Sequence, residues 1–172
     1  MITLAAWNDS EYASAELTAG EFALLGSTDG VTYTDHAADE PAQLTFDLDA
    51  SGLGPGSTVH ALFSVSTTEE SLGGSLEMVG SAESDSGLGV YLTYGVAQIS
   101  GTDCNAESFA EGEAVVAEGS ALSGSGAESQ ELAAGGEDPV NYCFRITLPE
   151  DAPNEAQGQV VSASWEFFGT SG

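Results

Sequence analysis

The sequence predicts an all-β protein: a jelly-roll-like antiparallel β-sandwich preceded by an extended N-terminal strand. Apolar residues recur with a period of two in short runs, and Gly, Pro, Ser, Asp and Asn separate these runs. Helical periodicity, by contrast, is almost absent. Because about nine or ten runs each present one apolar face, two packed sheets are needed to bury those faces.

The chain has 172 residues, enough for one domain with a substantial core, and 41% of them are hydrophobic. We divide it into an N-terminal segment, residues 1–10, and a sandwich domain, residues 11–172. The segment begins with a short apolar run that ends at Trp7, and Asn8, Asp9 and Ser10 then interrupt it. Residues 11–16 could form one helical turn before Gly20.

The predicted strands of the domain follow one another at short intervals. Asp29-Gly30 is a typical hairpin pair and predicts a turn over residues 27–30. Residues 111–136 are rich in Ala, Gly, Ser and Glu, and we expect loops there around one or two edge strands. The remaining strands are predicted over residues 21–25, 31–34, 44–48, 58–67, 75–80, 88–99, 140–148 and 159–168.

The two cysteines of the chain favour a disulfide on the outer face of a sheet. In the predicted strand over residues 140–148, Tyr142 and Phe144 share one face and Cys143 lies on the opposite face. A bond from Cys143 to Cys104 would fix the loop after Ile99; two buried free thiols are the alternative. One cysteine pair in a chain of this composition indicates an oxidising compartment.

The charge balance excludes several classes of partner. Asp and Glu number 28 and Lys and Arg only 1, which gives a net charge of −27. Nucleic acid and anionic membranes would be repelled by such a chain. No run of 18 apolar residues occurs, so we expect no membrane insertion. No basic region leads into an apolar stretch as in a secretion leader, and Met1 would suit an expressed mature form.

Catalytic groups are scarce in the sequence. His36 and His60 are the only histidines, and neither belongs to an HExxH motif or a helical pair of zinc ligands. We therefore expect no enzyme and no cofactor. Calcium is a possible ligand, because the acidic turns of the chain supply hard oxygen atoms. The evidence for it is weak, since none of these turns has the spacing of a known calcium-binding loop. The carboxylates concerned are Asp9, Glu11, Asp35, Asp39, Glu83 and Asp85.

Two N-terminal motifs resemble those of a known family. The stretch AAWNDSE at residues 5–11, followed by LTAGEFAL at residues 17–24, resembles the mature N-terminus of the TasA/camelysin family. Proteins of that family are secreted with a SipW-dependent type of signal peptide. The LGPGS corner at residues 53–57 and the closing SWEF strand at residues 164–167 extend the resemblance over nearly the whole chain.

The Gly-rich, Cys-bearing sequence looks most like actinobacterial members of the family. Two features differ from the family pattern. The near-absence of Lys and Arg departs from the bacillar members, and we attribute this to environment and surface charge. Some members carry a metalloprotease label, but the present sequence has no zinc motif to support that activity.

The resemblance implies a non-enzymatic, secreted cell-surface jelly roll. Its better-known members polymerise into matrix fibres by passing the N-terminal strand into the next subunit. Such a homopolymer is expected here, with other matrix components as further candidate partners. Strand addition of this kind pairs backbone groups and buries alternate side chains. The donor strand would be Ile2, Thr3, Leu4, Ala5, Ala6 and Trp7.

Two alternatives to this assembly remain at the level of the sequence. The N-terminal strand could pair within its own sheet, or the protein could be a monomeric cell-surface module that binds calcium or glycan. Within the strand, strict alternation places Ile2 and Leu4 on one face and Trp7 on the other. A bulge near residues 5–6 would turn Trp7 inward; otherwise Trp7 is a contact at the rim.

Overall fold

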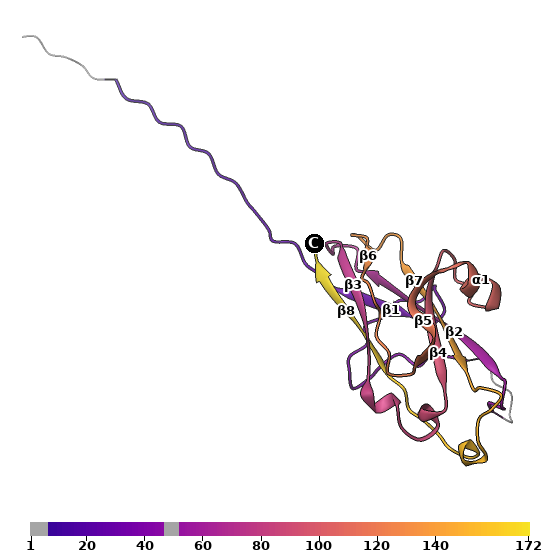
Figure 1. Ribbon diagram of the computed structural model, residues 1–172. Helices are drawn as coiled ribbons and strands as arrows, with labels where there is room; N and C mark the ends of the chain where they lie inside the picture. The colour runs from indigo at the N-terminus through magenta and orange to yellow at the C-terminus, as the bar shows by residue number, and fades with distance from the viewer. Residues whose placement is uncertain (1–6, 47–51) are drawn as a thin grey trace, which may run out of the picture.

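The computed structural model describes residues 7–46 and 52–172. Within these ranges eight strands form two antiparallel sheets that pack as a sandwich (Figure 1). The larger sheet has the order β1-β2-β7-β4-β5 and the smaller one β6-β3-β8. The strands are β1 (Leu24–Ser27), β2 (Thr58–Thr67), β3 (Gly74–Gly80), β4 (Thr93–Ile99), β5 (Glu113–Ala121), β6 (Gln130–Leu132), β7 (Val140–Thr147) and β8 (Trp165–Ser171).

The chain passes repeatedly from one sheet to the other. Every connection between consecutive strands crosses between the sheets except β1–β2 and β4–β5. One short helix, α1 (Ala106–Glu111), lies in the β4–β5 connection. The predicted all-β sandwich is therefore confirmed.

Strand β7 is the centre of the larger sheet, because β2 and β4 pair with its two edges along most of its length. Aromatic and β-branched residues dominate its sequence, VNYCFRIT, and such residues suit a strand covered on both faces. Tyr142 and Phe144 point into the sandwich and are fully buried. Cys143, on the other face, is buried as well.

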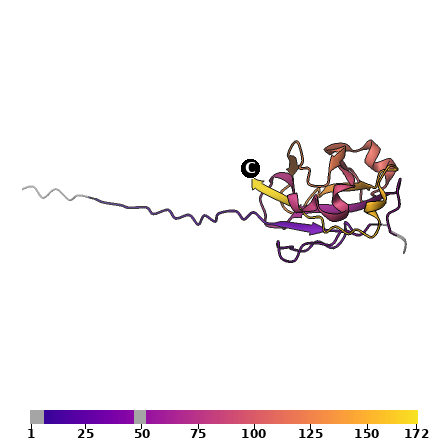
Figure 2. The same cartoon turned by 60° about the horizontal axis from the view of Figure 1, so that its bottom comes forward.

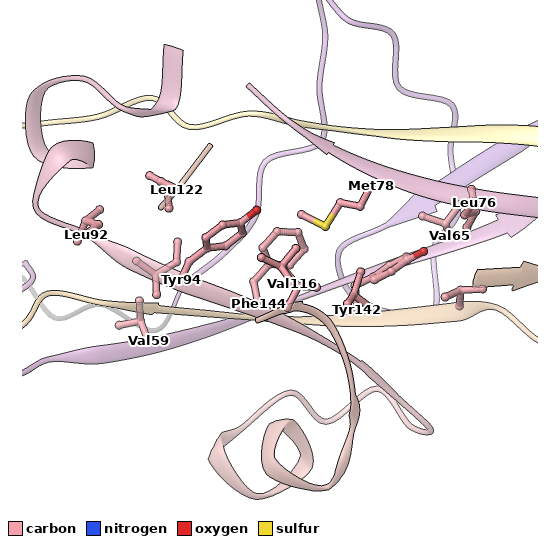
Figure 3. Packing of buried hydrophobic residues seen from close by; sticks show 14 of the residues in the cluster. Val59, Val65, Leu76, Met78, Leu92, Tyr94, Val116, Leu122, Tyr142 and Phe144 are labelled. Carbon is pink, nitrogen blue, oxygen red and sulfur yellow. The ribbon is translucent and has the colours of Figure 1, made fainter. Parts of the chain in front are cut away.

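The core lies between the two sheets (Figure 3), where Met78, Tyr94 and Phe144 meet. Aromatic rings join β7 to β8 across the core: the ring centroids of Phe144 and Trp165 lie 4.9 Å apart, and those of Tyr142 and Phe167 lie 4.8 Å apart. The buried hydroxyl of Tyr142 donates a hydrogen bond of 2.7 Å to Gln130 Oε1. Packing against β8 thus holds the smaller sheet on the larger one.

Several predicted strands begin or end elsewhere in the structure. The strand predicted over residues 88–99 begins at Thr93, because residues 87–90 form a 3-10 turn. The last strand begins at Trp165 and not at residue 159, because residues 159–164 have no strand partner in the described chain. The prediction for residues 31–34 reduces to a single bridge between Gly26 and Thr34.

Other predictions of local structure were wrong. Residues 11–16 form no helical turn, and residues 44–46 lie outside any strand although Leu44 and Phe46 pack on the core. The rest of that predicted strand lies outside the described residues. With these losses, the described chain has eight strands where nine or ten were expected. One or two edge strands were expected within residues 111–136, and two are present, β5 and β6.

Candidate functional site: the N-terminal segment and an apolar groove

The N-terminal segment, here residues 7–20, stands away from the domain (Figures 1 and 2). Every residue in it is exposed, and three large side chains, Trp7, Tyr12 and Leu17, are 94%, 93% and 93% exposed. In the described part of the chain its one side-chain hydrogen bond is local, from Ser10 N–H to Asp9 Oδ1 at 2.8 Å. Trp7 therefore does not pack into the core of the domain. The other proposed donor residues, Ile2, Thr3, Leu4, Ala5 and Ala6, lie outside the described residues.

The segment joins the domain at residues 20–23. Glu21 C=O accepts a hydrogen bond of 2.8 Å from Leu72 N–H, and Ala23 N–H donates one of 3.0 Å to Ser71 Oγ. Gly20 lies against the Leu72 side chain, which would have to shift to accommodate a Cβ at this position. The exposed segment thus continues about ten residues past the boundary that we set at residue 10.

A large groove opens between the two sheets on the side where β1 and β8 lie. Its volume is about 1430 Å³, above the range of roughly 300–1,000 Å³ that is usual for small-molecule pockets. Side chains of β2 and β7 form the floor, and Trp165 and Phe167 of β8 form one wall. Residues 35–38 and 41–44 contribute to the opposite wall. A groove of this size suits a length of polypeptide.

No Lys or Arg side chain is among the residues that line the groove. Asp35, Glu83 and Glu166 contribute to its lining, whereas the single cationic residue of the chain, Arg145, does not line it. Arg145 forms an ion pair with Glu118 at the surface of the larger sheet. An acidic occupant would therefore be held by apolar contacts and backbone hydrogen bonds, and charge would oppose its entry.

The predicted disulfide between Cys104 and Cys143 is present, with the two Cα atoms 5.2 Å apart. It lies on the outer face of the larger sheet beside Leu62 and Ile99. Helix α1 covers this region: its Phe109 packs against the small cluster, and the Arg145 guanidinium lies 5.6 Å from the centre of the Phe109 ring. The sequence placed the bond correctly and missed the helix.

The two histidines have different neighbours and do not contact each other. His60 lies on the outer face as expected, 6.3 Å from the Phe109 ring, and its burial lowers its pKa. No described residue forms a hydrogen bond with its buried Nε2 atom. His36 is exposed in the loop after β1, where its ring contacts the Thr34 hydroxyl at 3.1 Å.

The structure does not bring the calcium candidates together. Among the described residues no group of three or more His, Cys, Asp or Glu is arranged to hold a metal ion. Asp85 instead accepts a hydrogen bond of 3.2 Å from Ser123 N–H. A carboxylate outside the candidate set, Asp29, accepts 2.8 Å hydrogen bonds from the Thr32 and Val31 N–H groups, which lower its pKa to about 2.

Nowhere in the part of the chain that the structure describes is a helix long and apolar enough to cross a membrane.

Comparisons with known proteins do not assign this chain to a family. No protein-family model matches the sequence, and a search of curated proteins found no match.

Proposed function

We propose that this protein is a secreted structural subunit of an extracellular filament or biofilm-matrix fibre. In this proposal the N-terminal strand of one copy completes the β-sandwich of the next copy. The observation that carries the proposal is the exposure of residues 7–20, which hold Trp7, Tyr12 and Leu17 in water. The resemblance of the N-terminal motifs to the TasA/camelysin family supports it.

The energetic argument follows from these exposed side chains. Burying a large apolar side chain contributes about 1.5–3 kcal/mol before the cost of ordering the chain. Three such side chains on one extended segment therefore provide a substantial drive towards a partner. Because the segment and its acceptor are different surfaces of one subunit, the contact repeats head to tail and generates an open filament.

Two further features suit a protein that works outside the cell. A disulfide persists in oxidising compartments, and Cys104–Cys143 is the only cysteine pair of the chain. The net charge of −27 keeps isolated subunits apart and in solution until they are held by specific contacts.

Deletion of Met1–Ala6 tests the proposal. The truncated protein should keep the circular dichroism spectrum and thermal unfolding of a β-sandwich, yet form no filaments under electron microscopy. The variant Trp7→Ala should weaken assembly in the same direction. Its matched control is Val31→Ala, because Val31 is also largely exposed but lies in the loop after β1.

Two results would contradict the proposal. Normal filaments from the truncated chain would show that the N-terminal strand is dispensable for assembly. A truncated monomer that no longer folds would show that the strand belongs to its own core.

A further inference from the structure

We infer that the acceptor site is the seam between β1 and β8, and that its occupant is the N-terminal segment of a second copy, added as a strand to the free edge of β8. This inference rests on the proposed function and specifies the surface that it requires. The argument begins from the two seams of the sandwich, where the edges of the two sheets face each other.

The seam between β5 and β6 is closed by hydrogen bonds. Gly126 N–H donates to Met78 C=O of β3 at 2.8 Å, and Ala127 N–H donates to Val115 C=O of β5 at 3.1 Å. Gly80 N–H adds a bond of 3.0 Å to Ser125 Oγ. Residues 125–127 thus join the two sheets on this side and occupy the edges of β3 and β5 at Met78 and Val115.

The seam between β1 and β8 is different, because within residues 7–46 and 52–172 β8 pairs only with β3. A hydrogen bond to β3 or its flanks lies just beyond each end of β8. Ser81 N–H donates to Ser164 C=O before β8, and Gly172 N–H donates to Gly73 C=O after it, so the residues of this stretch that bond towards β3 are the even-numbered ones. Backbone groups alternate in direction along a strand, so those of the odd-numbered residues from 165 to 171 face the open edge. An unprotected edge of this kind is what an added strand pairs with.

The approach to β8 extends this edge. In residues 159–164 the alternation of the strand continues, with Val161 and Ala163 half-buried against the core and Ser162 exposed. Residues 159–167 line the groove and would span about 30 Å if extended, at about 3.3 Å per residue. The predicted donor run, residues 2–7, needs about 20 Å and fits within that length.

Gly169 marks one end of the site. A Cβ built there would lie 2.8 Å from Leu24 Cδ1 and 3.0 Å from the Phe22 ring. These two side chains pack over the inner face of β8 at Gly169, so the apolar groove ends there and an added strand would bury its side chains only alongside residues 159–167.

The geometry also favours the N-terminal segment of a second copy, and not that of the same chain, as the occupant of the groove. The segment leaves the domain next to the end of β8 and extends away from the domain (Figure 1). To enter its own groove it would have to reverse between Gly20 and Phe22, where the chain is fixed to Leu72 and packs on Gly169. Extended residues 8–20 instead provide a tether of about 43 Å to a neighbour.

Disulfide trapping in assembled protein tests the site. One chain carries Asn8→Cys and a second chain carries Ala163→Cys, which lies in the groove. The matched control pairs Asn8→Cys with Ala117→Cys, an exposed position on the edge strand β5. Mixed filaments are formed, oxidised, and examined by non-reducing electrophoresis and mass spectrometry. We expect a linked dimer with Ala163→Cys and loss of that product with Ala117→Cys.

The remaining outcomes separate this inference from the proposed function. Filaments in which residue 8 links to residue 117, or to neither position, overturn the β1–β8 seam and leave the filament function standing. In a chain that carries both Asn8→Cys and Ala163→Cys, a linked monomer would overturn the second copy as occupant. Failure of the unmodified protein to form filaments would overturn the proposed function, and the inference with it.

Discussion

Loss of the Cys104–Cys143 disulfide should cost this domain about 4 kcal/mol of free energy of unfolding. The two residues are 39 positions apart, and closing a loop of that length removes about 13 cal/mol/K of entropy from the unfolded chain on the chain-entropy estimate. At 25 °C this equals about 4 kcal/mol. For a domain of this size the melting temperature should fall by roughly 8–16 °C.

The comparison needs a form that keeps both sulfur atoms, since Cys143 is fully buried and its truncation would also leave a cavity. The protein is therefore unfolded in urea, reduced, and refolded under reducing conditions. Urea titrations of the reduced and oxidised forms, followed by tryptophan fluorescence, give the two free energies. The double variant Cys104→Ala/Cys143→Ala should lose more than the reduced protein because packing is lost as well. A difference below about 1 kcal/mol between the oxidised and reduced forms would refute the entropic reasoning.

Three more outcomes are expected. Phe144→Ala should lower the free energy of unfolding by about 3–5 kcal/mol in urea titrations, because its buried ring contacts three aromatic rings; a loss under about 1 kcal/mol would contradict this packing. Burial raises the pKa of Tyr94 to about 12, so its contribution to stability is complete below about pH 10 and is lost as the pH rises through 12, which absorbance of tyrosinate on alkaline unfolding would follow. Filament formation should be faster at higher ionic strength, because salt screens repulsion beyond about 10 Å at 0.1 M, and light scattering that falls steadily with added NaCl would contradict it. Calcium that acts at concentrations too low to alter screening would indicate a specific site.

The strands that could be predicted from the sequence are those whose side chains carry the pattern themselves. Strands β2 and β7 alternate apolar residues on one face, and both were found at nearly the predicted bounds. Strand β5 was harder to predict because Ala, Gly and Glu have little strand preference; its pairing with β4 makes it a strand. Helix α1 was hard to predict because it has only six residues. It is stabilised by an N-cap, in which the Asn105 side chain accepts hydrogen bonds from the Glu107 and Ser108 N–H groups.

The candidate site was predictable only in its donor half. An apolar run that ends at Trp7 is visible in the sequence, because its residues are consecutive. The groove combines strands with loop residues 35–46 and 152–164, which are far apart in the chain. Only the fold brings them together. The early end of strand pairing at Trp165, which leaves residues 159–164 outside the β3–β8 ladder, likewise depends on where β3 ends.

The way in which the N-terminal segment joins β1 has a mechanical consequence. The segment approaches the domain in roughly the direction of β1 (Figure 2), and β1 pairs with β2 in antiparallel fashion from Leu24 to Ser27. A pull along the segment therefore acts parallel to the strand and perpendicular to the hydrogen bonds between the two strands. These bonds are loaded in shear and must yield together, whereas a pull from the side would open them one after another. A subunit attached in this way should therefore resist a pull along its N-terminal segment better than expected for an edge strand of only four residues.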